Sequence, residues 1–389
     1  MAAAMTRSPL TPSIPAAEAL ATLHVDLDAL VANWRLLAAR AASAECAAVI
    51  KADAYGIGIA PAARALAAAG CCTFFVAHLS EALRVRETVG PGLTIYVLNG
   101  ILDDTETLAA LAHDDIRPVI ASPEQLRLWT GYHPRHGARP ACAVQIDTGM
   151  NRFGLSVIQA ETLAEKIRDL SPALVMTHFV SSEYLDDPLN ERQIERFERA
   201  TARLPGIARS MANSSAIFLP QRPFFDLVRP GYALYGGNPF PDQPNPMRPV
   251  VRLSAPILQI RDIEAGETVG YNAQWTAKRR SRLAVIGVGY ADGIPRNAMA
   301  TEAQAGGEAL VLGTRCPFAG RVSMDIIVLD VTDVTDPALA PGIEAELLND
   351  VITVDDLASR SKTIGYEILT SLGRRYHRVY AQNDLDHRP

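Results

Sequence analysis

The chain has 389 residues, 48% hydrophobic and 21% charged, a length and composition typical of a globular enzyme with two domains. Its net charge of −6 makes nucleic acid an unfavourable partner, because phosphate groups bind basic surfaces. The sequence has no apolar run of about 20 residues, so it predicts no membrane span.

Residues 1–20 are rich in alanine, proline and serine and lack the compact apolar segment of a signal peptide. We therefore predict a flexible N-terminal tail. The 5 cysteines form neither a CxxC motif nor a Cys/His spacing typical of zinc sites. An odd number of cysteines in partly apolar surroundings favours free thiols, no metal site and a cytoplasmic location.

Short apolar segments alternate with helical patterns between residues 45 and 235. Continuous apolar runs of this length suit strands buried on both faces of a parallel sheet. The strand-like segments are 46–50, 73–77, 93–98, 117–121, 141–146, 173–179, 208–213 and 225–230, and helical patterns lie at 29–42, 61–70, 79–90 and 189–204. This alternation predicts an α/β domain over residues 21–245, a (β/α)8 TIM barrel, although a doubly wound sheet has a similar pattern.

The composition changes near residue 240. Proline, glycine and asparagine crowd residues 236–249, which predicts a domain boundary. The segments that follow are β-like and separated by turn residues, at 250–260, 281–290, 309–331 and 345–348. We therefore predict a C-terminal, mainly β domain over residues 246–389.

Lys51 ends the first apolar segment, at the barrel mouth where active sites form. A lysine there can form a Schiff base with an aldehyde cofactor and act as an acid or base, although an isolated strand-end lysine is commonly a surface side chain. The segment KADAYGIG, which begins at Lys51, resembles without a gap the pyridoxal-phosphate lysine motif of the alanine racemase family. The resemblance implies that Lys51 binds pyridoxal 5′-phosphate covalently and that Tyr55 reaches its phosphate.

Two further barrel motifs resemble the same family. The segment DTGMNRFG implies that Arg152 lies near the substrate carboxylate and the phenolic oxygen of the cofactor. A planar guanidinium suits both anionic oxygens. The segment THF implies that His178 lies beside the cofactor ring and is linked to the catalytic tyrosine.

The last two barrel motifs imply the phosphate and pyridine sites. ANSSA resembles the phosphate-binding turn, with the Ser214 hydroxyl as donor and Asn213 beside it, and an ordinary helix cap has the same chemistry. LVRPGYALYGG implies that Arg229 faces the pyridine nitrogen, while the amides around Gly231 and Tyr232 help to hold the phosphate. Because arginine stays protonated, the ring nitrogen should remain unprotonated, and the cofactor should be a weaker electron sink than one paired with aspartate.

The second domain contributes three family motifs. GVGYADG resembles the loop of the catalytic tyrosine, here Tyr290. GRVSMDIIVLD implies that Met324 offers a backbone donor to the substrate carboxylate, and TIGYE implies that Tyr366 reaches the phosphate. These resemblances follow the family's order from about residue 20 to residue 380.

The resemblance implies an alanine racemase that interconverts L-alanine and D-alanine and supplies D-alanine for peptidoglycan. Inverting one carbon requires proton removal on one face and delivery on the other, so two acid/base groups are needed. Lys51 and Tyr290 are the candidates. In the family they come from different subunits, which implies a homodimer with shared active sites.

Three alternatives remain open at this point. A decarboxylase of similar architecture would pair the ring nitrogen with an acidic residue, where this chain has Arg229, and would carry a cysteine motif that the surroundings of Cys316 do not match. A non-catalytic carrier of the cofactor would lack residues 248–389. A racemase of serine or of a broader range of amino acids is the third.

One position departs from the family pattern. In many relatives the residue two before the DTGM segment is a lysine that carries a carbamate and orients the arginine. Here Gln145 occupies that position, and a carbamate requires a primary amine. We therefore expect the Gln145 amide oxygen to accept a hydrogen bond from Arg152 in place of the carbamate. The alternative is that a chloride ion or a water molecule positions Arg152.

Overall fold

The computed structural model describes residues 14–135 and 137–382. Residues 1–13 of the predicted tail lie outside the described residues, and the rest of it includes the 3-10 turn η1 (Ala16–Glu18). The chain forms two compact units. The barrel unit comprises Ala29–Tyr55 and Ile59–Arg248, and the β unit comprises the described residues through Asp28, Gly56–Gly58 and those from Pro249 onward. Within the described residues, no helix is long and apolar enough to cross a membrane.

The barrel unit is built on a parallel sheet whose two ends meet in one strand. That strand has two halves, β2 (Glu45–Cys46) and β3 (Ala48–Val49), of which β2 pairs with β11 and β3 pairs with β4. The other strands, in sheet order, are β4 (Thr73–Val76), β5 (Thr94–Val97), β6 (Arg117–Ile120), β7 (Ala143–Asp147), β9 (Leu174–Met176), β10 (Ala208–Ser210) and β11 (Leu227–Val228), and the short β8 (Leu155–Ser156) pairs with β7. The predicted barrel strands are confirmed.

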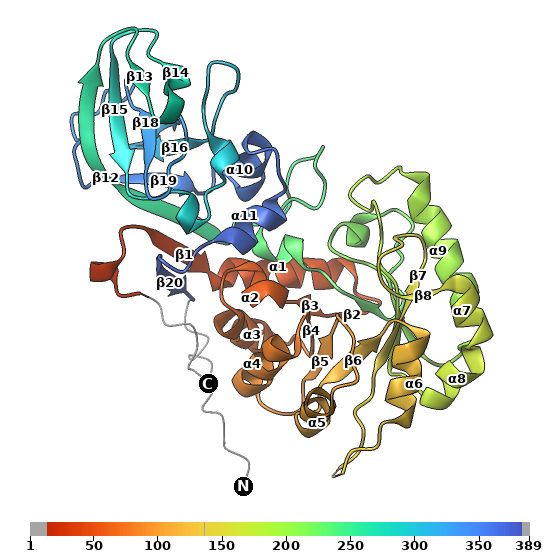
Figure 1. The fold of residues 1–389 in the computed structure, drawn as a ribbon. Coiled ribbons are helices and arrows are strands. Elements are labelled where there is room, and N and C mark those ends of the chain that lie inside the picture. Colours follow the sequence, from red (N-terminus) through yellow and green to blue (C-terminus); the bar gives the residue numbers. More distant parts are fainter. Residues whose placement is uncertain (1–13, 136, 383–389) are drawn as a thin grey trace. The chain divides into compact units, whose positions relative to one another are not determined.

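Helices follow most barrel strands and surround the sheet (Figure 1). They are α1 (Leu27–Arg40), α2 (Lys51–Tyr55), α3 (Ile59–Ala68), α4 (Leu79–Val89), α5 (Thr105–His113), α6 (Pro123–Gly131), α7 (Val157–Thr162), α8 (Ala164–Leu170) and α9 (Pro188–Thr201). Capping residues fix where a helix begins. Asp187 caps α9 by accepting from the Leu189 amide, and Pro188 occupies the first position of that helix. After β10 and β11 the chain forms only the 3-10 turns η2 (Ser215–Phe218) and η3 (Tyr232–Tyr235).

The barrel core explains the sequence pattern. All four residues of β4 are buried, and Phe74 and Phe75, which point to opposite faces of the strand, are both fully buried. One face of a barrel strand packs in the interior and the other packs against helices, so both faces are apolar.

The β unit is built around an eight-stranded sheet. Its strands are β1 (Thr22–Asp26), β12 (Val251–Ile263), β15 (Ser281–Ile286), β16 (Glu308–Val311), β17 (Thr314–Pro317), β18 (Ile327–Asp330), β19 (Glu344–Leu348) and β20 (His377–Ala381). A separate hairpin, β13 (Thr268–Val269) and β14 (Trp275–Thr276), the 3-10 turns η4 (Tyr271–Ala273), η5 (Tyr290–Asp292) and η6 (Arg296–Ala298), and the helices α10 (Val354–Arg360) and α11 (Gly365–Ser371) complete the unit. The prediction of a mainly β C-terminal domain is confirmed.

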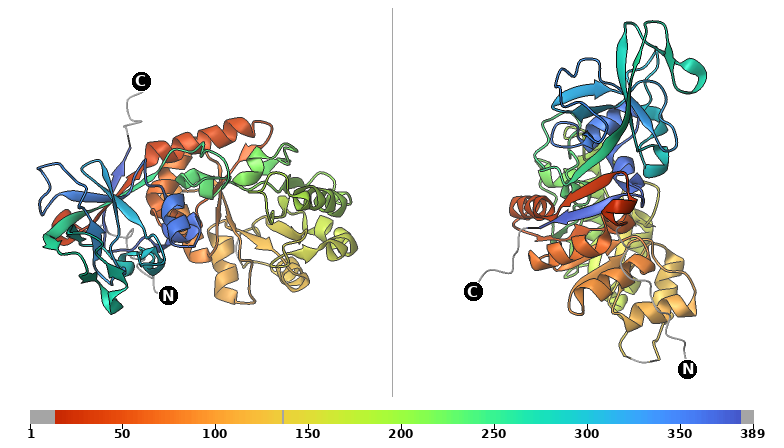
Figure 2. Two further views of the ribbon diagram at one scale, coloured as in Figure 1. Left: turned by 90° about the horizontal axis from the view of Figure 1, so that it is seen from above. Right: turned by 90° about the vertical axis from the view of Figure 1, so that its left-hand side faces the viewer.

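Strand β1 belongs to the β unit, although the predicted barrel domain began at residue 21. It pairs antiparallel with β12 and parallel with β20, so the two ends of the described chain lie side by side (Figures 1 and 2). Its residues alternate between buried and more exposed positions. Such alternation is typical of a strand with one covered face and differs from the doubly buried barrel strands.

Candidate active site

The barrel rim gathers the predicted cofactor residues. Lys51 comes shortly after β3, His178 after β9, and Arg229 directly after β11. The segments with Arg152 and Ser214 follow β7 and β10. Because the strands are parallel, all these segments leave the sheet at the carboxyl-end rim, where barrel active sites form.

Lys51 begins α2, which is a left-handed turn. Residues 52–55 have φ between 51° and 55°, and none of them is glycine. Left-handed backbone is unfavourable for residues with a Cβ, and runs of it mark functional sites held by their surroundings. Lys51 itself is partly exposed, and burial together with the nearby Arg152 lowers the pKa of its amine, while Glu81 opposes that shift.

His178 and Arg229 form an electropositive part of the rim. Arg229 is buried and donates from its guanidinium to the Thr177 carbonyl at 2.6 Å and to the Ser210 hydroxyl. Burial lowers the pKa of Arg229 to about 9, so it remains charged near neutrality. Burial, Arg229, Arg152 and Lys51 together lower the pKa of His178 to about 3, so His178 is neutral there.

Hydrogen-bond donors lie close together at the end of the Lys51 turn, where Tyr55 stands. Ser214 is buried, and its hydroxyl oxygen accepts from the amides of Gly231 at 3.0 Å and Ala233 at 3.2 Å, which leaves its own proton to donate elsewhere. A Cβ on Gly231 would meet the Tyr55 hydroxyl oxygen at 2.5 Å. Gly231 therefore lets the Tyr55 hydroxyl approach the backbone, and two hydroxyl groups in one place fit the recognition of a phosphate. Tyr232 is buried beside them at the start of η3.

Asn213 contributes through its turn. Its side-chain oxygen accepts from the Ser182 hydroxyl at 2.8 Å and from the Ala216 amide at 3.0 Å. Those two bonds fix the turn before η2. Asn213 therefore orients the neighbouring Ser214, in agreement with the capping role that such residues usually have.

Arg152 is exposed, and Gln145 supports its loop through the backbone. The Gln145 side-chain nitrogen donates to the Phe153 carbonyl at 2.8 Å. The expected bond was from Arg152 to the Gln145 amide oxygen, and the bond found here is to the residue after Arg152. An uncharged amide has both donors and an acceptor, so it can bind the loop carbonyl where a carboxylate cannot.

The β unit brings Tyr290 and Met324 together. The Tyr290 amide donates to the Ser323 carbonyl at 3.0 Å, and the Ala291 amide donates to the Met324 carbonyl at 3.0 Å. A Cβ at Gly289 would lie 2.3 Å from the Met324 carbonyl oxygen, so only glycine permits this approach. Both side chains are exposed, Tyr290 by 40% and Met324 by 53%.

Arg375 joins the Tyr290 and Met324 loops, and no sequence pattern indicated this role. Its guanidinium binds both carboxylate oxygens of the buried Asp292, at 2.7 and 2.9 Å, and reaches Asp325 at 2.8 Å. The two carboxylates raise the pKa of Arg375. Asp292 also accepts from the Gly289 amide at 2.9 Å, so the bridge fixes the turn that carries Tyr290. Arg375 is distant in sequence from both aspartates.

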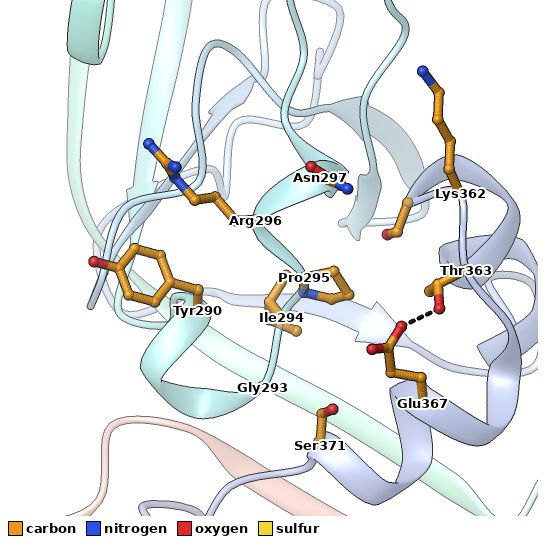
Figure 3. A pocket seen from close by; sticks show the side chains of 11 residues that line it. Tyr290, Gly293, Ile294, Pro295, Arg296, Asn297, Lys362, Thr363, Glu367 and Ser371 are labelled. Carbon is orange, nitrogen blue, oxygen red and sulfur yellow. Dashed lines mark hydrogen bonds between the residues drawn. The ribbon is translucent and has the colours of Figure 1, made fainter.

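Tyr366 lies in the first turn of α11 and is exposed by 40%. Elsewhere in the β unit, a cavity of about 390 Å³ has Tyr290 and Glu367 in its lining. In Figure 3, Ile294 and Pro295 lie between these two side chains, and the Tyr290 hydroxyl points away from the Thr363–Glu367 hydrogen bond.

Glu81 is a second residue that we did not predict. It lies at the third position of α4, where its carboxylate contacts the Lys51 turn. A glutamate three residues into a predicted helix indicates a capping box but does not reveal the second contact. Among the described residues, no group of three or more His, Cys, Asp or Glu side chains is placed to hold a metal ion.

Family models cover both units. A model for the N-terminal domain of alanine racemase matches residues 25–239, and a model for its C-terminal domain matches residues 250–380. An alanine racemase of Methylobacterium sp. (strain 4-46) is 50% identical over 364 residues, which are 92% of this chain and 97% of that protein.

Solved structures agree in fold. An alanine racemase from Bartonella henselae with covalently bound pyridoxal phosphate has a TM-score of 0.85 at 36% identity, covering 93% of this chain and 100% of that one. The biosynthetic alanine racemase from Pseudomonas aeruginosa has a TM-score of 0.86 at 31% identity, covering 94% of this chain and 100% of that one.

Proposed function

The chain belongs to the alanine racemase family, whose members use pyridoxal 5′-phosphate, and from that premise we propose that it interconverts L-alanine and D-alanine. The observation that carries the proposal is the barrel rim: a lysine amine of lowered pKa, a buried arginine and a cradle of hydroxyl donors leave the same end of one sheet. This donor set fits the cofactor, because an aldehyde requires an amine and a phosphate requires donors.

We assign the cofactor contacts residue by residue. Lys51 would hold the aldehyde carbon, while Tyr55, Ser214, Tyr366 and the Tyr232 amide would hold the phosphate. The Gly231 amide, which we predicted as a phosphate donor, donates to the Ser214 hydroxyl and would act through it. When bound, the cofactor withdraws electrons from the α-carbon of the amino acid and makes its proton acidic. Arg229, His178 and the turn at Asn213 would complete the pocket.

The charges of the side chains support racemisation. Arg229 is held by the Thr177 carbonyl and the Ser210 hydroxyl and stays protonated, so it would offer the cofactor ring a positive charge in place of a carboxylate. Arg152 would bind the substrate carboxylate, together with the backbone at Met324.

Two proton-transfer groups are required on opposite faces of the α-carbon. The lowered pKa of Lys51 increases the neutral fraction of its amine, which is the form that accepts a proton. Tyr290 is the proposed second group. Its phenol can donate a proton, and its phenolate can accept one.

We propose that Tyr290 and Met324 serve the site of a partner subunit in a homodimer. Several large apolar side chains of the β unit are strongly exposed, including Tyr271, Met324 and Ile364 at 68%, 53% and 62%. An interface with a second subunit would remove such side chains from water, which is favourable. A second copy of this chain is the partner that the shared-site arrangement requires.

We further propose that the D-alanine serves peptidoglycan and that the enzyme is cytoplasmic. The similarity to a biosynthetic relative supports the first point, and 5 free cysteines, of which only Cys72 is exposed, support a reducing compartment. A decarboxylase is not favoured, because Arg229 stands where a decarboxylase would have an acidic residue. A racemase of serine or of a broader range is also not favoured, because the relatives are alanine racemases.

One experiment tests the proposal. The purified protein is reduced with borohydride and digested, and L- and D-alanine, serine and lysine are assayed for inversion by chiral chromatography. We expect a pyridoxyl group on the Lys51 peptide and inversion of alanine above all other substrates. Lys51→Ala should lose both, whereas Lys166→Ala, a change on helix α8, should lose neither. Inversion by Lys51→Ala without added amine would contradict the assignment.

A further inference from the structure

The left-handed turn after Lys51 requires support from outside itself. Its four residues, 52–55, all carry side chains, yet all have φ near 54° in place of the usual negative value. The turn also separates the two side chains assigned to opposite ends of the cofactor, since Lys51 begins it and Tyr55 ends it. Whatever holds the turn therefore sets the positions of both groups.

The carboxylate of Glu81 makes the contacts that hold it. Oxygen Oε1 accepts from the Ala52 amide at 2.6 Å and, more weakly, from the Asp53 amide at 3.4 Å. Oxygen Oε2 accepts from the amides of Ala77 and His78, at 2.8 and 3.2 Å, where β4 passes into α4. One side chain thus joins the turn to the start of the neighbouring helix, using both oxygens as acceptors.

A second pair of bonds fixes the far part of the turn. The Asp53 carboxylate accepts from the Ile59 amide at 2.9 Å, and Arg84 of α4 lies 3.5 Å from it. Helix α4 therefore contacts the turn twice, through Glu81 and through Arg84. Of these two α4 side chains, Glu81 contacts the backbone of the left-handed residues, and Arg84 contacts the Asp53 side chain.

Helix α6 offers a matched case with the opposite chemistry. Gln125 is the third residue of α6, as Glu81 is the third residue of α4. The Gln125 side-chain oxygen accepts from the Ala121 amide at 2.8 Å, and the Glu81 carboxylate accepts from the Ala77 amide in the same way. The Gln125 side-chain nitrogen then reaches back to donate to the Ile101 carbonyl at 3.1 Å. A glutamine suits a neighbouring carbonyl, and a carboxylate suits neighbouring amides, so the residue type at this position matches the group it meets.

We propose that Glu81 is a positioning residue: its carboxylate holds the left-handed turn and thereby sets where the Lys51 amine and the Tyr55 hydroxyl stand for the cofactor. This role rests on the proposed function for its significance, but the contacts themselves do not. Glu81 is only partly buried and lies outside the donor cradle, so its effect is exerted through the turn.

The negative charge of Glu81 has a second measurable effect, on the pKa of Lys51. Among the described residues, Arg152, His178 and Glu81 interact electrostatically with Lys51, and of these three Glu81 is the negative one. Glu81 raises the pKa of the lysine against the effects of burial and Arg152. Glu81→Gln keeps the size of the side chain but removes the charge and one acceptor. The Lys51 amine should then titrate at lower pH. A residue that merely stabilised helix α4 would not cause that shift.

The experiment compares Glu81→Gln with Gln125→Glu, the reverse swap at the matched position of α6. The protein contains only Lys51, Lys166, Lys278 and Lys362 as lysines, so an amine-acylating reagent followed by mass spectrometry of the cofactor-free protein reports the pKa of Lys51 by itself. A titration with pyridoxal 5′-phosphate gives its affinity, and thermal unfolding reports stability.

For Glu81→Gln we expect affinity for pyridoxal 5′-phosphate to fall about tenfold or more, since bonds to a charged acceptor are lost, and the Lys51 labelling profile to move to lower pH. Gln125→Glu should lose stability and change neither. If Glu81→Gln fails to fold, Glu81→Asp keeps the charge but shortens the reach, and it should weaken affinity without moving the profile. Unchanged affinity together with an unchanged profile in Glu81→Gln would overturn the proposal. If the wild type did not invert alanine, the proposed function would be contradicted. The proposal for Glu81 would stand, because the labelling result does not depend on racemase activity.

Discussion

At the scale of single residues, the proposed site depends on which side chains carry charge. Arg229 keeps its proton because even a pKa of about 9 lies above neutrality, while His178 is neutral because its pKa is about 3. Two neighbouring nitrogen bases thus differ in charge at the same pH. A neutral His178 can exchange hydrogen bonds with nearby groups without adding positive charge to the rim.

The first prediction concerns His178 and stability. An unfolded histidine binds a proton below about pH 6.5, whereas the folded His178 does so only near pH 3. The unfolded chain therefore binds more protons between those values, so the contribution of His178 to stability is present above about pH 6.5 and is lost as the pH falls. Because His178 is partly exposed, the loss should stay below ~1.4 kcal/mol per pH unit.

Thermal unfolding between pH 6.5 and 5 measures this effect. His178→Gln should lose less stability over that range than the wild type, because glutamine does not titrate. His133→Gln, at an exposed position, serves as the control and should follow the wild type. Parallel curves for the wild type and His178→Gln would mean that His178 titrates normally in the folded protein.

The second prediction concerns Gln145, which is 8% exposed and supports the Arg152 loop through the Phe153 carbonyl. Gln145→Ala removes that donor, so Arg152 should be misplaced and kcat/KM for alanine should fall about tenfold, mostly through KM. Removing carbon dioxide from the buffer should have no effect on the wild type, because glutamine forms no carbamate. A kcat/KM for Gln145→Ala equal to that of the wild type would show that another group positions Arg152.

At the scale of elements, the sequence predicted those helices and strands that have a local pattern of apolar residues. Barrel strands were recognisable because both of their faces are buried, as at Phe74 and Phe75. Residues 22–26 lacked that pattern, so their place in the other unit went unnoticed. The left-handed turn had no signal either, because residues 52–55 include no glycine and their conformation depends on Glu81, which is distant in sequence.

The same reasoning applies to the candidate site. Family motifs indicated the residues proposed for chemical roles, such as Lys51 and Tyr290, because those motifs are contiguous in sequence. The residues that orient them are joined only by folding: Arg375 and Asp292 are 83 positions apart, and Gln145 binds a carbonyl that any residue could offer. Long-range ion pairs and side-chain bonds to the backbone leave no periodicity in the sequence.

The third prediction tests the close approach of two loops in the β unit. Gly289→Ala would place a Cβ 2.3 and 2.4 Å from the carbonyl oxygens of Met324 and Ser323, so one loop must move. We expect kcat to fall at least about tenfold with cofactor attachment to Lys51 unchanged, since an error of about 1 Å in placement is costly. Gly131→Ala, where an added Cβ meets open space, should leave kcat unchanged. Full activity of Gly289→Ala would show that the approach is not required.

At the scale of the whole molecule, the account requires two copies of the chain. The barrel unit supplies Lys51 and the groups assigned to the cofactor, and the β unit supplies Tyr290 and Met324. A symmetric dimer in which each β unit serves the partner's barrel forms two equivalent sites. The barrel site of a single subunit would then lack one of the two proton-transfer groups.

The fourth prediction follows from that arrangement. Mixing Lys51→Ala with Tyr290→Phe, each inactive by itself, should restore activity once subunits exchange. A mixed dimer has one site with both changes and one with neither, so random mixing should give at most about a quarter of wild-type activity. Light scattering checks that the mixture is dimeric, and subunits labelled differently in mass check the exchange. No restored activity in a mixture that has exchanged would indicate a self-contained site.

The most direct test of the central claim, that Lys51 and Tyr290 act on opposite faces of the α-carbon, is solvent deuterium exchange in Tyr290→Phe. The variant and the wild type are incubated in deuterium oxide with L-alanine or D-alanine, and deuterium at the α-carbon is measured early in the reaction. We predict that the wild type incorporates deuterium from both enantiomers, while Tyr290→Phe retains exchange from one and loses most of it from the other, with cofactor still bound to Lys51. Equal incorporation from L- and D-alanine by Tyr290→Phe would contradict the account.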